Sequence, residues 1–208
     1  MGSNVKIVLA CLFIVIFQSV AVAASGPYVR GSIGASFVED ISGSSPYNSS
    51  FNNKFNSGPV YGAAAGYRWD NLRLEGEFVF QENDYDKIQN SSGGYVDAKG
   101  SISNQSLLLN GYYDFLNESK FTPFVGAGLG VSKVEINDLL ATGWSKSLSR
   151  DDTVLGYQLS AGVAAALSES YQLVVYYRYL TTEDPHFDSD VDYEFSSHNI
   201  VLGLRVDF

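Results

Sequence analysis

The sequence predicts an all-β fold, an eight-stranded antiparallel up-and-down transmembrane β-barrel with four long extracellular loops and three short periplasmic turns. Three observations lead to this prediction. The last eleven residues alternate between apolar and polar side chains and end in Phe208, and seven earlier segments alternate in the same way. The connections between these segments are alternately long and short, and charged residues occupy the polar face of several segments. A closed barrel in lipid accounts for all three, because closure removes the sheet edges and alternation separates a lipid-facing side from a lumen-facing side.

The N-terminal residues have the pattern of a cleaved secretory signal peptide. Lys6 precedes an apolar run that ends in small residues at Ala23 and Ala24. We therefore expect a signal peptide at residues 1–24 and a single barrel domain at residues 25–208. Cleavage would remove one Lys and the one Cys, and the formal charge would become 12 − 23 = −11. Thiol catalysis and disulfides are then excluded, and nucleic acid, which is held mainly by Lys and Arg, is not an expected partner.

The first half of the barrel follows from four alternating segments, each about as long as the ~9–11 residues that a membrane strand needs. These expected strands cover residues 28–38, 60–69, 72–81 and 102–115. Asp70 and Asn71 predict a tight turn, whereas the polar stretches 39–57 and 82–101 are expected to be long loops. The apolar face comprises Val29, Ile33, Ala35 and Phe37; Tyr61, Ala63, Ala65, Tyr67 and Trp69; Leu72, Leu74, Phe78 and Phe80; and Leu107, Leu109, Tyr113 and Phe115.

The second half repeats the pattern. The expected strands cover residues 121–132, 153–167, 171–180 and 198–208. Pro123 lies near the start of the first of these, where a missing backbone donor is tolerated, and residues 116–120 and 168–170 form the short turns. Long loops are expected at 133–152 and 181–197. The apolar face comprises Val125, Ala127, Leu129 and Val131; Leu155, Tyr157, Leu159, Ala161, Val163, Ala165 and Leu167; Leu173, Val175, Tyr177 and Tyr179; and Ile200, Leu202, Leu204, Val206 and Phe208.

The alternation alone does not tell which face points inward, and a soluble lipocalin-like barrel would have the two faces reversed. The charges favour the membrane barrel, because ions flanked by apolar residues suit a closed lumen. An eight-stranded lumen is just wide enough for side chains to fill it, so we expect a salt-bridged plug, with a narrow Arg-lined channel as the alternative. The predicted lumen ion cluster is Arg30, Arg68, Arg73, Glu75, Glu77, Arg178 and Arg205, and its expected polar partners are Asn110, Tyr112, Gln158 and Tyr176.

Several short motifs carry a family resemblance. They are Tyr28-Val29-Arg30-Gly31, Gly62-Ala63-Ala64-Ala65-Gly66-Tyr67-Arg68, Pro123-Phe124-Val125-Gly126-Ala127-Gly128-Leu129-Gly130, Tyr176-Tyr177-Arg178-Tyr179 and the terminal Phe208. The mature chain resembles the opacity-protein and porin-like family of small bacterial outer-membrane barrels, which is related in fold to the transmembrane domain of outer membrane protein A. The resemblance implies a surface antigen or adhesin, in some members a narrow pore. We expect neither a cofactor nor enzyme activity. The resemblance also implies contact with outer-membrane lipid and lipopolysaccharide, and insertion by the barrel assembly machinery, which reads Phe208 as a signal.

Recognition by such a barrel is expected in its long loops, where aromatic and polar side chains would contact a host or matrix ligand from a rigid scaffold. The aromatic candidates, chosen by position, are Tyr47, Phe51, Phe55, Tyr85, Tyr95, Trp144, Phe187 and Tyr193. Asp188, Asp190 and Asp192 have the spacing that opens a calcium loop, but the Gly and the distant Glu of that motif are absent. We therefore expect solvated charge, with weak bridging of divalent ions between this loop and lipopolysaccharide as the alternative.

A lipid hydrolase is a remote alternative. Ser196 and His198 share one strand face, with Glu194 as the acid, and outward-facing Ser and His pairs are typical of outer-membrane lipid A deacylases. The order of Ser and His here is the reverse of theirs, and nucleophile, base and orienting acid would all have to coincide.

Overall fold

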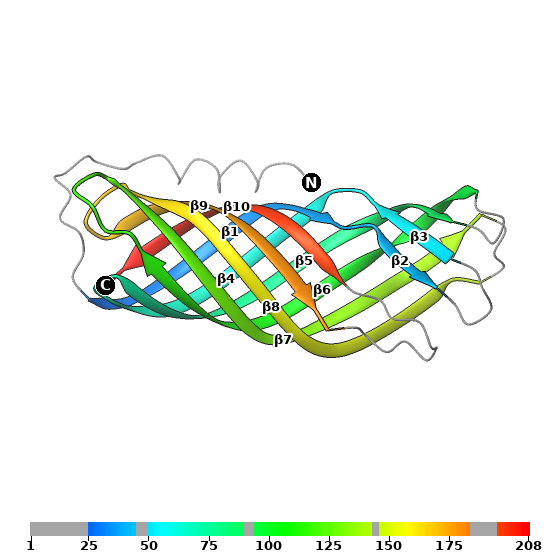
Figure 1. Ribbon diagram of the computed structural model, residues 1–208, viewed down its shortest axis with the longest axis horizontal. Coiled ribbons are helices and arrows are strands. Elements are labelled where there is room, and N and C mark those ends of the chain that lie inside the picture. Colours follow the sequence, from blue (N-terminus) through cyan, green and yellow to red (C-terminus); the bar gives the residue numbers. More distant parts are fainter. Residues whose placement is uncertain (1–24, 45–49, 90–93, 143–145, 184–194) are drawn as a thin grey trace, which may run out of the picture.

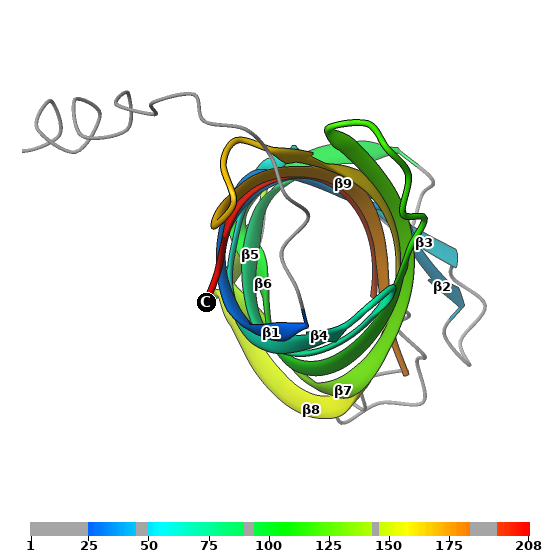
Figure 2. The same cartoon turned by 90° about the vertical axis from the view of Figure 1, so that its left-hand side faces the viewer.

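Eight strands form a closed ring in the computed structural model, which describes residues 25–44, 50–89, 94–142, 146–183 and 195–208 (Figures 1 and 2). Consecutive strands of the ring pair antiparallel, and β1 pairs with β10 to close it. The up-and-down barrel that the sequence predicts is therefore confirmed. The ring strands are β1 (Gly26–Val38), β4 (Gly58–Trp69), β5 (Leu72–Gln89), β6 (Tyr95–Asp114), β7 (Phe121–Ala141), β8 (Leu148–Ala166), β9 (Tyr171–Thr182) and β10 (Ser196–Asp207).

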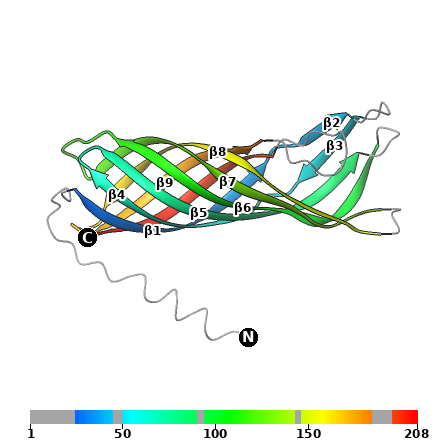
Figure 3. The same cartoon turned by 90° about the horizontal axis from the view of Figure 1, so that it is seen from below.

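The two ends of the barrel differ. The three short turns and the C-terminus lie at one end, here called the turn end (Figure 1). Asp70, in the turn between β4 and β5, has φ of +50°, a left-handed conformation that Asp tolerates better than most residues. At the opposite, loop end, β2 (Ile41–Ser44) and β3 (Ser50–Phe55) form an extra hairpin, which stands beyond the ends of β1 and β4 (Figure 3).

Apolar side chains cover the outside of the ring, whereas the inside holds the buried charged side chains together with a cluster of apolar and aromatic ones that includes Phe124 and Val174. The outward residues Ile33, Leu107 and Leu129 are 59%, 61% and 62% exposed, whereas the inward residues Arg30 and Glu77 are 5% and 1% exposed. The soluble barrel with reversed faces is therefore wrong for this chain. No helix within the described residues is long and apolar enough to cross a membrane.

The prediction of long loops at residues 39–57, 82–101 and 133–152 is wrong in large part, because these ranges contain β-strands. β5 to β8 are 18 to 21 residues long, whereas β1, β4, β9 and β10 have 12 or 13. The β2–β3 hairpin occupies part of the first expected loop, and β3 pairs with β5. We name this projecting structure the platform: residues 41–44, 50–55, 82–89, 95–105, 133–141 and 148–154.

Where the strands enter the platform, the two faces exchange their character: apolar residues lie on the inner face and polar residues on the outer face. On β7, Val131 points outward and is 48% exposed, whereas Val134 points inward and is 1% exposed. Between them, on the outer face, Lys133 lies against Glu135 and Asp151, and its hydrogen bond with Glu135 raises the pKa of its ammonium group. Above the lipid the outer face meets water, so the apolar residues turn inward as they do in a soluble barrel.

Candidate functional site

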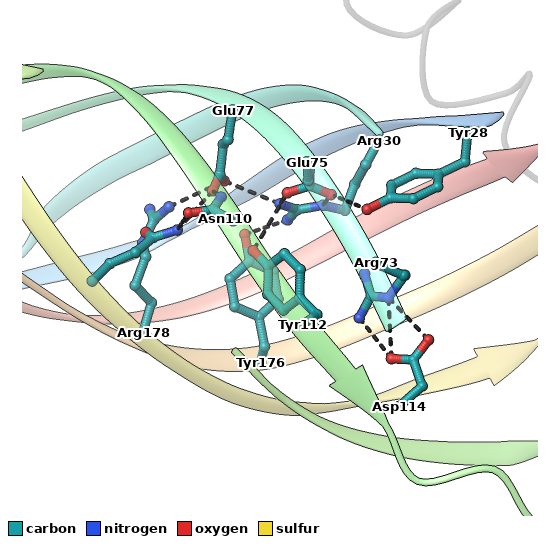
Figure 4. Close-up of polar contacts among 11 residues, drawn as sticks. Tyr28, Arg30, Arg73, Glu75, Glu77, Asn110, Tyr112, Asp114, Tyr176 and Arg178 are labelled. Carbon is teal, nitrogen blue, oxygen red and sulfur yellow. Dashed lines mark hydrogen bonds and ion pairs between the residues drawn. The ribbon is translucent and has the colours of Figure 1, made fainter. Parts of the chain in front are cut away.

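The structure places all seven residues of the predicted lumen ion cluster inside the barrel. They extend from β1, β4, β5, β9 and β10, and each is at most 5% exposed. Their positions follow from the period-2 alternation, since each occupies the polar face of its strand. Figure 4 shows the main contacts of this cluster.

Glu75 and Glu77, neighbours on the inward face of β5, form the centre of the cluster. Arg30 bridges them, with its Nη2 at 2.5 Å from Oε1 of Glu75 and 3.2 Å from Oε1 of Glu77. Arg178 Nη1 donates to the same oxygen of Glu77 over 3.2 Å. The expected polar partners all take part: Asn110 and Gln158 donate to Oε2 of Glu77, Tyr112 donates to Glu75, and Arg30 donates to the hydroxyl of Tyr176.

A second group of ions lies nearer the turn end. Arg73 donates to Asp114 through Nε at 2.9 Å and Nη2 at 2.8 Å, and its guanidinium lies 4.4 Å from the ring centre of Tyr112. Arg205 pairs with Asp207 at 3.3 Å. Asp114 and Asp207 are not among the predicted members of the cluster, although both lie on the polar face of their strands, where the period of two places them inside. Among the described residues, five buried Arg thus face four buried carboxylates.

Side chains fill the lumen at the level of this cluster. Arg30 and Arg73 line a gap together with Tyr112, Phe124, Val174 and Tyr176, and the gap does not admit a water-sized sphere. Phe124 packs edge-on against Tyr112, with ring centres 5.7 Å apart. This packing favours the plug over the Arg-lined channel.

The platform has an apolar cluster of its own. Tyr85 is 5% exposed within it, so its expected role as a surface contact is wrong: the side chain faces inward above the lipid, where the alternation has reversed. Phe55 is half-buried against Tyr85, with ring centres 4.7 Å apart. The buried members of the cluster are Tyr85, Ile88, Ala98, Ile102, Val134, Ile136, Leu139 and Phe195.

The other expected loop contacts divide into two groups. Tyr95 is 45% exposed at the start of β6, and Lys54 Nζ lies 4.8 Å from its ring centre. Phe51 lies on β3, where its backbone pairs with Gly43. Tyr47, Trp144, Phe187 and Tyr193 lie outside the described residues, as do the suggested metal ligands Asp188, Asp190 and Asp192. Within the described ranges, no group of three or more His, Cys, Asp or Glu side chains is placed to hold a metal ion.

The Ser and His expected in a hydrolase both have other partners in the structure. Both ring nitrogens of His198 are engaged, Nδ1 with the hydroxyl of Tyr177 at 2.5 Å and Nε2 with Oε1 of Glu39 at 2.6 Å. Ser196 is 3% exposed and interacts with the hydroxyls of Tyr179 and Thr181. Glu194 lies outside the described residues. His198 would have to give up a partner before it could act as a base for Ser196.

The terminal Phe208, expected to be the assembly signal, lies at the turn end and is 77% exposed. Its backbone nitrogen donates to the carbonyl of Pro27, over 3.1 Å. The terminus is thus fixed against the first strand, while its side chain stays accessible.

Comparisons with known proteins agree with this architecture. PagN, an outer membrane protein of Salmonella typhimurium, is 24% identical over 128 residues, which cover 55% of this chain and 54% of PagN, so the chain spans about half of that relative. RC1281, a candidate adhesin of Rickettsia conorii, is 28% identical over 175 residues, which cover 75% of this chain and 70% of RC1281. The crystal structure of Neisserial surface protein A superposes with a TM-score of 0.59 at 22% identity, over 89% of this chain and 99% of that one, which shows the shared fold. The family model described as outer membrane protein beta-barrel domain matches residues 7–208, and the chain therefore belongs to this family of the bacterial outer membrane.

Proposed function

We propose that this protein is a surface adhesin or antigen without enzyme activity, whose platform presents the binding surface. The observation that carries this proposal is the apolar cluster inside the platform, where Ile102 and Val134 are 3% and 1% exposed. A structure with its own buried cluster holds a fixed shape, which reduces the entropy lost when a ligand binds. The names of the relatives, an outer membrane protein and a candidate adhesin, support the same role.

The reach of the platform also supports a contact function. On β7 the outward apolar face ends at Val131, so about ten residues of the strand extend beyond it, up to Ala141. At ~3.4 Å per residue and a tilt of ~45°, they would project roughly 25 Å, several times the ~5–8 Å depth of a head-group layer. The binding surface would therefore stand clear of the lipid.

The charge of the platform and its surroundings indicates the class of ligand. Exposed carboxylates outnumber exposed Lys and Arg at the loop end of the described chain. The carboxylates are Glu39, Asp40, Glu82, Asp84, Asp86, Asp97, Asp138, Asp151 and Glu183, and the cations are Lys87, Lys99, Lys146 and Arg150. Like charges repel and opposite charges steer association, so we propose a basic patch on a host or matrix protein as the ligand, rather than a sulfated polysaccharide.

The absence of enzyme activity is part of the proposal, and the partners of His198 support it. With Nδ1 and Nε2 both bonded, this ring ties Tyr177 to Glu39 instead of activating Ser196. Purified barrel incubated with lipopolysaccharide or phospholipid vesicles should release no fatty acid beyond the level of the His198→Gln variant. Release of fatty acid by the unmodified protein, but not by the His198→Gln variant, would overturn the proposal that the protein has no enzyme activity.

The adhesin proposal is tested by display in the outer membrane of a non-adherent bacterium and by binding to a panel of immobilised matrix proteins. The platform variant is Asp84→Asn, Asp86→Asn and Asp97→Asn, all exposed. This variant should lose most of the binding to its ligand. Raised salt should likewise weaken the binding of the unmodified protein, because salt screens the charges.

A matched control removes the same number of charges at the turn end, with Asp70→Asn, Glu118→Gln and Glu169→Gln, which are also exposed. It should bind like the unmodified protein. Equal binding by the platform variant and this control, or binding that added heparin strengthens, would contradict the proposed ligand class.

A further inference from the structure

The extra β2–β3 hairpin is joined to the barrel by a two-residue link. Glu39 and Asp40 form this link, between the end of β1 at Val38 and the start of β2 at Ile41. The backbone nitrogen of Glu39 donates to the carbonyl of Ser196 over 2.9 Å, one step beyond the last pair of the β1–β10 ladder. The base of the hairpin is therefore held to the barrel through Glu39.

The side chain of Glu39 is held at the same place by His198 of β10. Nε2 of His198 lies 2.6 Å from Oε1 of Glu39, and Nδ1 lies 2.5 Å from the hydroxyl of Tyr177 on β9. The imidazole ring also contacts the rings of Tyr177 and Tyr179, with ring centres 5.9 and 5.2 Å away. Phe37 of β1 lies opposite His198 in the ladder on the other side. Groups from β9, β10 and the end of β1 thus meet at one imidazole ring.

The partners of this ring determine where its protons lie. A carboxylate only accepts hydrogen bonds, so Nε2 of His198 carries a hydrogen whenever it bonds to ionised Glu39. In the neutral ring, Nδ1 then accepts from the hydroxyl of Tyr177, whereas in the protonated ring Nδ1 donates to the oxygen of that hydroxyl. Both forms of His198 keep both contacts, but the protonated form adds charge attraction to the bond with Glu39.

Protons from the solution can reach this ring, because the side chains of His198 and Glu39 are 39% and 52% exposed. Among the described residues, the titratable groups that face the ring are Glu39, Tyr177 and Tyr179. Asp40 follows Glu39 in the link and is exposed. Imidazole is the side chain that ordinarily changes charge between pH 5 and 8. As the pH rises through this range, the contact with Glu39 therefore changes from an ion pair to a neutral hydrogen bond.

We propose that Glu39, His198 and Tyr177 form a pH-sensitive latch, which fixes the base of the β2–β3 hairpin to the barrel. The latch is tighter in mildly acidic medium, where protonated His198 faces ionised Glu39. It is looser at pH 8, where the ring is neutral, and it also weakens in strong acid, where the carboxylate is protonated. Because the hairpin is part of the platform, the shape of the platform is most firmly fixed in mildly acidic surroundings.

Hydrogen exchange of the Glu39 amide tests the latch. The mature protein, labelled with ¹⁵N, is studied by NMR in lipid nanodiscs, and exchange rates are corrected for the intrinsic effect of pH. Protection of this amide should rise roughly two- to fivefold from pH 8 to pH 6, as expected for an exposed ion pair.

The Glu183 amide is the internal control for this measurement. It donates to the carbonyl of Leu155 over 2.8 Å, and Glu183 also lies one residue beyond the end of a strand. Its side chain bonds to the hydroxyl of Tyr157 instead of an imidazole. Protection of this amide should be the same at pH 6 and pH 8. An equal change at both amides, or no change at Glu39, would overturn the proposal.

Two variants assign the pH response to one ring. His198→Gln retains a donor for Glu39 but does not titrate, so its Glu39 amide should be equally protected at pH 6 and pH 8. This variant also separates His198 from His186, the other His of the chain. The matched control is Tyr177→Phe, which removes one partner of the ring and keeps the titrating group, and it should retain the pH response. A response that persists in His198→Gln would overturn the latch.

The consequence for binding rests on the proposed function of the platform, whereas the exchange measurement does not. The unmodified protein should bind the panel of immobilised matrix proteins more strongly at pH 6 than at pH 8, when compared with His198→Gln at the same two pH values. A pH-dependent Glu39 amide together with unchanged binding would support the latch and would overturn the role of the hairpin in adhesion.

Discussion

Replacement of Glu77 by Gln should destabilise the barrel strongly, although the two side chains have nearly the same shape. Glu77 is 1% exposed, and its two oxygens face four donors: Arg30 and Arg178 at Oε1, Asn110 and Gln158 at Oε2. Gln keeps one oxygen and places an NH₂ group where the other was. In either orientation two of the four donors lose their acceptor, and Arg178 loses its counter-charge, whereas Arg30 keeps Glu75.

The expected loss is about 3–5 kcal/mol in the free energy of unfolding, the range measured when one partner of a buried ion pair is removed. Counting two buried donors left unpaired at ~1–3 kcal/mol each gives a similar figure. The measurement is urea unfolding of mature protein refolded into lipid vesicles, followed by tryptophan fluorescence and by the gel shift of the heat-denatured form, with linear extrapolation to zero urea.

Glu135→Gln is the matched control, because Glu135 pairs with Lys133 on the outer, water-exposed face of β7. It should change the unfolding midpoint little, since exposed ion pairs contribute little to stability. The double variant Glu77→Met with Arg178→Met should be more stable than Glu77→Gln, because it removes both charges instead of isolating one. A loss below about 1 kcal/mol for Glu77→Gln would refute the view that the central carboxylates hold the lumen together.

Two further changes test the assembly signal and the platform. Deletion of Phe208 should lower the amount of folded barrel in the outer membrane, whereas Phe121→Ala, at another exposed aromatic of the turn end, should not; full yield without Phe208 would remove its role as a signal. Ile102→Ala leaves a cavity in the platform cluster and should cost about 2–5 kcal/mol locally. Hydrogen exchange of amides in the loop-end half of β6 should then accelerate, while Leu107→Ala, which is 61% exposed to lipid, should leave it unchanged.

Much of the barrel was predictable because a strand has a strict period of two. Arg178 identifies the inner face of β9 by itself, since a charge between apolar neighbours has no place in lipid. Asn110 and Gln158 could be assigned to the same interior by parity, and both reach Glu77. The pairing of particular ions, such as Arg73 with Asp114, could not be predicted from the sequence. It depends on the stagger between neighbouring strands, and alternation alone does not specify that stagger.

The β2–β3 hairpin was missed for a different reason. Its residues are polar and rich in Ser and Asn, which is typical of loops. It forms strand because β3 pairs with the projecting end of β5, with a register shift between Lys54 and Phe55. Tertiary pairing thus overrides local propensity here, as it often does for strands.

The reversal of the alternation carries more information than the alternation itself. A search for a single apolar face stops at Val131 on β7 and treats the following residues as loop, yet Val134 and Ile136 continue the same period with the opposite phase. The same change occurs at β10. Ile200, on the strand, is an outward apolar residue and is 59% exposed, whereas Phe195, just before the strand, is an inward apolar residue and is 1% exposed. Apolar and polar residues alternate with a period of two on both sides of this change, so both parts are strand. Which of the two faces is apolar depends on whether lipid or water lies outside the barrel. A phase change along one strand therefore marks the membrane boundary, and the strand beyond it is the part of the barrel that a ligand can reach.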